Sequence, residues 1–181
     1  MNAVVLAQRL ARNNAWSNLR LHRACAGLDE AAWRAQRTSF FPSLPRTLNH
    51  ILIVDWYYVD ALEGGTRGLA CFADEVPFPD APALAAAQRA IDLRFVAFTD
   101  RLRTDADLAA EVRMPRKNHV QVDTVANVIL HLTTHQTHHR GQAHAMLAGT
   151  AVNPPQLDEY FLRGELHLRE HELRELGLPI E

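Results

Sequence analysis

The sequence predicts an all-α fold. Four segments of roughly twenty residues each carry apolar residues at the i, i+3, i+4 spacing of a helix, and proline or glycine residues stand near most of their ends. Residues 105–122 are less regular, because residues 114–122 break the helical period and are expected to be extended. A length of 181 residues and a hydrophobic content of 48% fit a single domain with a sizeable core.

The first predicted helix covers residues 3–27, with Gly27 near its end. Asp29 then has the character of a helix cap and precedes a short helical segment that contains Trp33. Residues 36–44 are expected to connect this segment to the next long helix.

The second predicted helix covers residues 45–62, with Ser43 as its cap and Pro45 in its first turn. It is apolar nearly all round, as expected of a helix at the centre of a bundle. The following loop, residues 64–82, is long and contains proline and two phenylalanines. A loop of this length either covers a functional site or is a packed surface connection.

The third and fourth predicted helices cover residues 82–102 and 123–148. We expect residues 1–162 to form one helical domain, followed by a charged helical tail over residues 163–181. The tail has a narrow apolar stripe, so it packs either on the domain or on a second subunit, which would make the protein a homodimer. Its own pair of histidines lies among charged residues and is expected to be exposed.

The fourth predicted helix holds the strongest chemical signal in the chain. Four of the ten histidines fall within nine consecutive residues: His131, His135, His138 and His139. His139 lies within the apolar stripe of the helix and His135 at its margin, whereas His131, His138 and His144 point away from it. Two histidines four residues apart project from one side of a helix and can bind one metal ion together.

Burial of two imidazoles has a physical cost that a metal would remove. Each buried ring has two nitrogens, and a nitrogen without a partner costs about 1–3 kcal/mol. A single core histidine usually bonds to a backbone or side-chain group, but two rings on one apolar stripe are harder to satisfy. We therefore interpret His135 and His139 as half of a metal site.

A third ligand must come from elsewhere in the chain, and the second predicted helix offers two candidates. His50 shares a side with Ile53, Val54 and Tyr57, and Asp55 lies about 140° away around the helix. The two side chains cannot easily point at one centre. One of them is a candidate ligand, and the other supports the structure.

Composition excludes several classes of function. The formal net charge is −2 and no long Lys/Arg run is present, so we expect no nucleic-acid partner. No apolar run is long enough to cross a bilayer, and no signal peptide opens the chain. Cys25 and Cys71 form no C-x-x-C pair and are expected to be reduced thiols of a cytoplasmic protein. Glu-x-x-His, the repeat of di-iron bundles, does not occur.

Several motifs together resemble the DinB family. They are Asn13-Asn-Ala-Trp16-Ser-Asn18, Leu44-Pro-Arg-Thr-Leu-Asn-His50 with Asp55 and Trp56, His135-x-x-x-His139-Arg-Gly-Gln142, and Pro154-Pro-Gln-Leu-Asp158. The resemblance covers roughly residues 3–162. It implies an antiparallel four-helix bundle, with long crossover loops allowed, and one divalent metal ion on His50, His135 and His139.

The resemblance also bears on activity, because relatives of known function transfer thiol cofactors or isomerise thiol adducts. Three neutral imidazoles leave a divalent ion, zinc or nickel, with its full charge and an open position that favours a thiolate or hydroxide. We therefore expect a thiol S-transferase acting on a small molecule with a low-molecular-weight thiol. A metal-dependent hydrolase and a non-catalytic metal-binding protein remain alternatives. Tyr57 and Gln142 are candidate catalytic helpers, or else packing residues.

Overall fold

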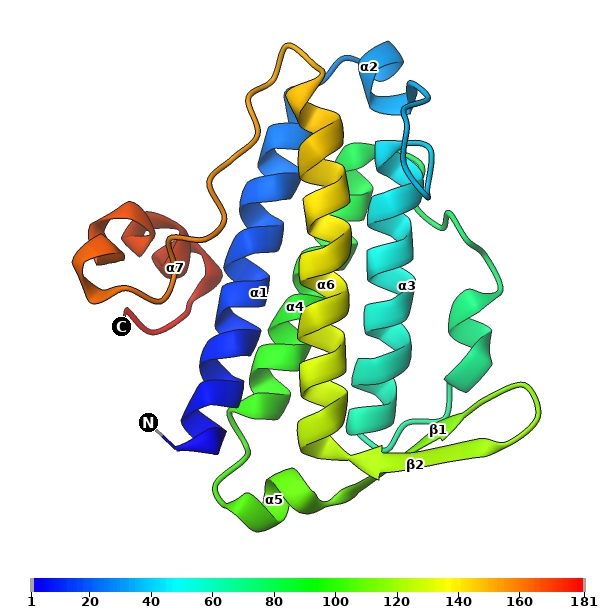
Figure 1. The fold of residues 1–181 in the computed structure, drawn as a ribbon, viewed down its shortest axis with the longest axis vertical. Coiled ribbons are helices and arrows are strands. Elements are labelled where there is room, and N and C mark those ends of the chain that lie inside the picture. Colours follow the sequence, from blue (N-terminus) through cyan, green and yellow to red (C-terminus); the bar gives the residue numbers. More distant parts are fainter. Residues whose placement is uncertain (1, 181) are drawn as a thin grey trace.

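The computed structural model describes residues 2–180 and is built around four long helices (Figure 1). These are α1 (Ala3–Ala26), α3 (Leu44–Leu62), α4 (Ala81–Thr99) and α6 (Val125–Ala148). Both α1 and α3 pack against α4 and α6, so α1 and α3 occupy opposite corners of a four-helix bundle. The predicted all-α bundle is confirmed, with a small hairpin as its only sheet among these residues.

Short elements connect and flank the long helices. They are α2 (Glu30–Arg34), η1 (Gly68–Phe72), α5 (Asp105–Ala109), β1 (Glu111–Pro115), β2 (Val120–Thr124), η2 (Arg163–Leu168) and α7 (Glu170–Leu176). The two strands pair antiparallel, with Glu111 opposite Thr124 and Pro115 opposite Val120. The hairpin thus accounts for the stretch whose helical period is broken in the sequence.

The bundle is not antiparallel throughout, because α3 and α4 run in the same direction (Figure 1). Near the start of both helices, the Asn49 amide donates to the Phe78 carbonyl at 2.8 Å and accepts from the Phe78 amide at 3.0 Å. Near their ends, Arg94 forms an ion pair with Glu63 at 2.6 Å. The long segment after α3 returns the chain along the length of the bundle, and this crossover makes the two helices parallel.

Side-chain caps explain where most of the helices begin. Asn2, Asp29, Asp80 and Thr124 each precede a helix in extended backbone and accept a hydrogen bond from an amide of its first turn. Asp29 acts as the sequence predicts. Ser43 also occupies the cap position, but its side chain makes no capping hydrogen bond. The proline in the first turn, whose backbone angle already suits a helix, therefore favours the start of α3 at this point.

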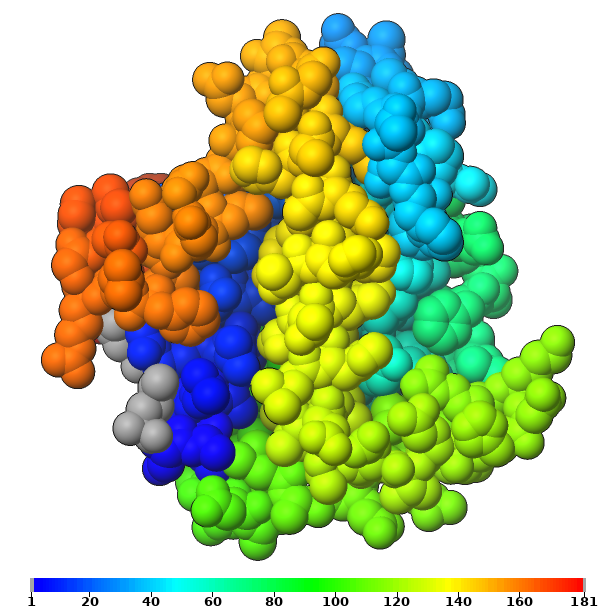
Figure 2. Space-filling view, viewed as in Figure 1, coloured from blue at the N-terminus to red at the C-terminus, as the bar shows by residue number. Residues whose placement is uncertain are grey.

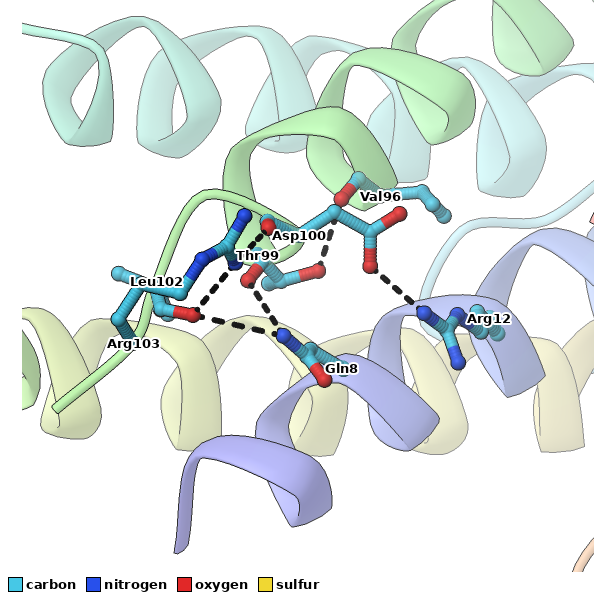
Figure 3. Close-up of polar contacts among 7 residues, drawn as sticks. All are labelled: Gln8, Arg12, Val96, Thr99, Asp100, Leu102 and Arg103. Atoms are coloured by element: carbon cyan, nitrogen blue, oxygen red, sulfur yellow. Dashed lines mark hydrogen bonds and ion pairs between the residues drawn. The ribbon is translucent and has the colours of Figure 1, made fainter. Parts of the chain in front are cut away.

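The end of α4 is fastened to the beginning of α1 (Figure 3). The Gln8 amide donates to the carbonyls of Thr99 and Leu102 at 3.4 and 3.5 Å. One turn further along α1, Arg12 pairs with Asp100 at 2.7 Å. Both contacts join the first half of α1 to the residues at and just after the end of α4.

The C-terminal tail helix α7 packs against α1. Leu173 and Leu176 are buried, and Arg20 of α1 pairs with Glu172 at 3.0 Å. The sequence predicts an apolar stripe made of Leu162, Leu166, Leu173 and Leu176. Leu162 remains 63% exposed, so this stripe is buried only in part. The two histidines of the tail are exposed, as predicted.

Both cysteines, Cys25 and Cys71, are buried and free. Burial raises the pKa of the Cys25 thiol to about 12, so that thiol stays protonated at neutral pH. Between residues 2 and 180, no helix combines the length and the apolar character that a bilayer crossing requires.

Candidate metal centre

Three histidines from two helices converge near the start of α3 and in the second half of α6. His50 of α3 faces His135 and His139 of α6, and each offers a ring nitrogen within 4.8 Å of the other two. The Nε2 atoms of His50 and His135 are 3.1 Å apart. Two nitrogens bound to one ion at about 2.0–2.1 Å would be separated by about 2.9–3.4 Å for bond angles near 90–110°. The distance between His50 and His135 falls in this range, and the three rings together form a group that could hold one metal ion.

The helical period determines which histidines of α6 take part. His139 is only 7% exposed and lies among the buried apolar residues of the predicted stripe, and His135 is half-buried beside it. The antiparallel packing of α3 on α6 then brings His50 opposite this pair. The ring centroids of His135 and His139 lie 4.4 Å apart, and that of His50 lies 4.7 Å from His139.

Burial keeps the three rings neutral. Burial, with a smaller contribution from neighbouring histidines, lowers the pKa of His50 to about 4 and that of His135 to about 3. Burial also lowers the pKa of His139, while its hydrogen bond to Gln142 acts in the opposite direction. Neutral imidazole is the form that binds metal, so these rings are ready to act as ligands at neutral pH.

One hydrogen bond fixes the orientation of a ligand. The Nδ1 atom of His139 lies 2.8 Å from Oε1 of Gln142, one turn later in α6. Because an amide oxygen only accepts, Nδ1 carries the proton and Nε2 keeps its lone pair for a metal. Gln142, a predicted helper, thus contacts a ligand histidine, and its own amide nitrogen lies 3.2 Å from His138.

A cavity of about 300 Å³ opens beside His50. Its other walls are Phe41, Arg46, Ile53, Phe72, Glu75 and Val76. Three of these residues belong to the long loop between α3 and α4. The loop between α3 and α4 therefore forms part of the wall of the cavity beside His50.

Phe41 is a site residue that sequence reasoning missed. Its ring lies 4.3 Å from His50 and 5.6 Å from His139, measured between centroids. The segment that carries it lies against α6 in the space-filling view (Figure 2). Residues in an irregular connection follow no helical period, so the sequence cannot predict which way their side chains point. The adjacent phenylalanines Phe40 and Phe41 were the only indication that this segment makes an apolar contact.

Tyr57, the other predicted helper, is directed at the hairpin. Its hydroxyl donates to the carbonyl of Pro115 at 2.6 Å, and its ring lies 5.2 Å from that of Phe72. The Arg116 guanidinium lies over the same ring at 5.3 Å. Burial raises the pKa of Tyr57, which keeps the phenol protonated. Tyr57 therefore supports the wall of the cavity from behind.

The remaining histidines of α6 lie outside the three-histidine group. His131 packs its ring against Tyr58 at 4.9 Å. His138 is exposed, and His144 lies with Nε2 3.0 Å from the carbonyl of Pro155. The helical stepping of the sequence placed all three away from the core stripe, and the group identified among residues 2–180 does not include them.

Asp55 belongs to a separate, buried polar network. Its carboxylate accepts hydrogen bonds from Gln88 of α4 at 2.7 Å and from Gln136 of α6. Burial raises the pKa of Asp55 to about 7, although both amides act to lower it. The alternative between His50 and Asp55 is thereby resolved: His50 faces the other histidines, and Asp55 supports the bundle interior.

The network extends across the bundle to α1. Asp92 accepts hydrogen bonds from Asn14 at 3.0 Å and Asn18 at 2.9 Å, and the Arg140 guanidinium donates to the amide oxygens of the same asparagines. Burial raises the pKa of Asp92 well above its usual value and lowers that of Arg140 to about 10. Arg140 also donates to Gln136 at 3.1 Å, so the network ties α1, α4 and α6 together.

Comparison with known proteins places the chain in a family. A family model described as DinB family matches residues 1–169. The chain belongs to the DinB family. Protein DinB of Bacillus subtilis (strain 168) is 22% identical over 161 residues, which cover 85% of this chain and 92% of that protein. The DinB motifs recognised in the sequence therefore reflect membership of the family.

A solved structure has the same fold. The crystal structure of a DinB-like protein from Bacillus cereus ATCC 10987 superimposes with a TM-score of 0.60 and 18% sequence identity. The match covers 78% of this chain and 90% of that one. At this level of identity the likeness shows the DinB-type fold alone.

Proposed function

We propose that this DinB protein is a metal-dependent thiol S-transferase that uses zinc or nickel on His50, His135 and His139. The observation that carries the proposal is the convergence of three neutral imidazoles beside an aromatic-walled cavity. Bound there, a divalent ion would supply positive charge that lowers the pKa of a thiol reaching it. The DinB motifs favour a thiol over water as the nucleophile.

The cavity walls suit an apolar electrophile. Phe41 and Phe72 line the cavity beside His50, and the Phe41 ring lies 4.3 Å from that of His50. Arg46 and Glu75 stand at the cavity 3.8 Å apart, and both side chains are largely exposed. They offer one positive and one negative partner for the charged groups of a small thiol.

The reaction proposed is a substitution at carbon. The thiol sulfur forms a bond to an electrophilic carbon while the bond from that carbon to its leaving group breaks. The leaving group departs with the electron pair, and the thiol proton passes to solvent. In this scheme Gln142 keeps the His139 ring oriented, and the aromatic walls hold the electrophile near the sulfur.

Cobalt substitution tests the proposal directly. Addition of cysteine or glutathione to the cobalt-substituted protein should change its visible absorption, because a thiolate ligand adds a charge-transfer band. Turnover is then measured with the same thiols and a fluorogenic haloalkyl electrophile. Turnover of an ester such as p-nitrophenyl acetate without thiol would instead assign a hydrolase, and neither response would assign a non-catalytic metal-binding protein.

Two adjacent phenylalanines supply a matched pair of variants. Phe41→Ala removes a ring that contacts two ligand histidines, and we expect it to lower transferase turnover at least tenfold while the metal content stays unchanged. Phe40→Ala is the control, because Phe40 is 80% exposed. Equal turnover in both variants would contradict the assignment of the cavity as the substrate site.

A further inference from the structure

A large cavity lies between α1, α6 and the segment that follows α6. Its volume is about 550 Å³, within the usual range for small-molecule sites. Helix α6 stands between α1 and α3 in Figure 1, and this cavity shares no wall residue with the one beside His50. We refer to it as the α1–α6 cavity.

The wall of this cavity includes a buried cation that has no direct counter-ion. Arg140 is 5% exposed, and its guanidinium is always positively charged. Its hydrogen-bond partners are amide oxygens, and no carboxylate among residues 2–180 forms an ion pair with it. Asp92 and Asp55 attract it only from a greater distance. Buried charges in proteins are usually paired, so an anion from outside would supply the partner that this cation lacks.

Two nitrogens of the Arg140 guanidinium are free to bind such an anion. All of its hydrogen bonds to amide oxygens use Nη1. Nε and Nη2 make no hydrogen bond in the part of the chain that the structure describes. They are not among the unbonded polar atoms that are sealed inside the protein, so they remain accessible where Arg140 lines the cavity. Nε and Nη2 lie on one edge of the guanidinium and form the fork that binds both oxygens of a carboxylate.

The rest of the wall supplies apolar surface and one further donor. Leu10 of α1 and Leu157 and Phe161 of the segment after α6 line the cavity. Asn13 accepts a hydrogen bond from the Ser17 hydroxyl at 3.1 Å, and its own amide nitrogen makes no hydrogen bond to any residue from 2 to 180. A carboxylate held at Arg140 would thus have room for an apolar body beside it.

One residue of the wall opposes an anion. Asp158 is exposed and accepts a hydrogen bond from the Gln156 side chain. Solvent screens a charge at the surface, whereas a buried charge acts through a lower effective dielectric constant. Arg140 is buried and Asp158 is not, so we expect the attraction by Arg140 to exceed the repulsion by Asp158.

We infer that the α1–α6 cavity binds a small monocarboxylate with an apolar body. The two carboxylate oxygens would accept hydrogen bonds from Nε and Nη2 of Arg140. The apolar body would lie against Leu10, Leu157 and Phe161. This inference does not depend on the metal centre or on the proposed transferase activity.

Protein NMR on the full chain, with 3-phenylpropionate as the probe, tests the inference. The probe should saturate with a Kd of about 1 mM or lower. Its uncharged amide, 3-phenylpropionamide, lacks the anion, and acetate lacks the apolar body. Each should bind at least about tenfold more weakly. Absence of saturable binding of 3-phenylpropionate would overturn the inference, as would equal binding of the acid and its amide.

Variants at Gly141 locate the ligand without altering the buried network. Gly141 lies on the cavity wall, and a Cβ atom added there would meet no atom within 4 Å outside the backbone of its own helix. Gly141→Leu fills part of the cavity and should weaken binding of 3-phenylpropionate at least about tenfold. Gly141→Ala is the matched control, because it removes the same glycine and leaves most of the space open. Equal affinity in Gly141→Leu and Gly141→Ala would place the ligand elsewhere.

Charge variants test the chemistry of the site. Arg140→Lys keeps the positive charge but lacks the fork, so binding of 3-phenylpropionate should weaken at least about tenfold. Asp158→Asn removes the like charge and should tighten binding by about two- to threefold. Unchanged affinity in Arg140→Lys, or affinity no tighter than that of the parent in Asp158→Asn, would contradict the assignment. If Arg140→Lys fails to fold, Gly141→Leu decides.

Discussion

His139 and Arg140 are consecutive in α6, yet their side chains serve different parts of the bundle. The His139 ring lies 4.7 Å from that of His50, whereas Arg140 is buried and donates to Asn18 at 3.2 Å. One residue along a helix is a rotation of about 100°, which separates the two directions. We therefore expect that the three-histidine group and the supporting network can be altered independently.

Metal retention should depend on only one face of α6. His135→Ala and His139→Ala remove ligand nitrogens, so the purified variants should lose the metal. His138→Ala and His144→Ala should keep it near the parent level, because these rings lie outside the three-histidine group. Elemental analysis of protein purified without chelator or a nickel column measures the metal content. Equal loss in all four variants would show that the wrong face has been assigned.

Gln142 should tune the metal affinity without holding the metal. Gln142→Leu removes the acceptor that orients His139, and loss of such a hydrogen bond typically costs about 10–100-fold in affinity. Competition with a chromophoric chelator measures this change. Gln142→Glu restores an acceptor and should recover the affinity. If both variants bind as tightly as the parent, the hydrogen bond does not matter for the site.

A substitution in the buried network should lower the stability of the fold without changing the three-histidine group. Arg140→Met leaves amide oxygens of Asn14, Asn18 and Gln136 without their donor, and we expect a loss of about 3–5 kcal/mol in the free energy of unfolding. Urea unfolding measures it. The control Arg113→Ala alters an exposed strand residue and should change stability by less than about 0.5 kcal/mol. If Arg140→Met lost no more stability than this control, the buried network would not stabilise the fold as we expect.

His22 should make stability fall in mild acid. Burial lowers its pKa in the folded state to about 4, while the unfolded chain titrates near 6.5. Below pH 6.5 His22 therefore binds a proton in the unfolded state but stays neutral in the folded state. The free energy of unfolding decreases as the pH falls from 6.5 to about 4. The shift corresponds to about 3 kcal/mol. Urea unfolding at pH 7 and pH 4.5 should show a smaller difference for His22→Phe than for the parent; an unchanged difference would contradict this.

The positions of the long helices and the face of α6 that carries His135 and His139 followed from sequence alone. Both depend on local information, namely the 3.6-residue period and the residues that start and end helices. That is why His135 and His139 could be separated from three other histidines in the same segment. It is also why the hairpin appeared only as a break in that period.

Contacts between distant segments needed the tertiary structure. The sequence showed that the side chains of His50 and Asp55 point in different directions, but not which of them faces the other histidines. The structure decided this, because Gln88 and Gln136 donate hydrogen bonds to Asp55 from two other helices. The placement of Phe41 over His50 depends on how an irregular connection folds back onto α3 and α6. The parallel course of α3 and α4 likewise depends on the crossover loop, because a helical period fixes which side of a helix is buried but not the direction of its neighbour.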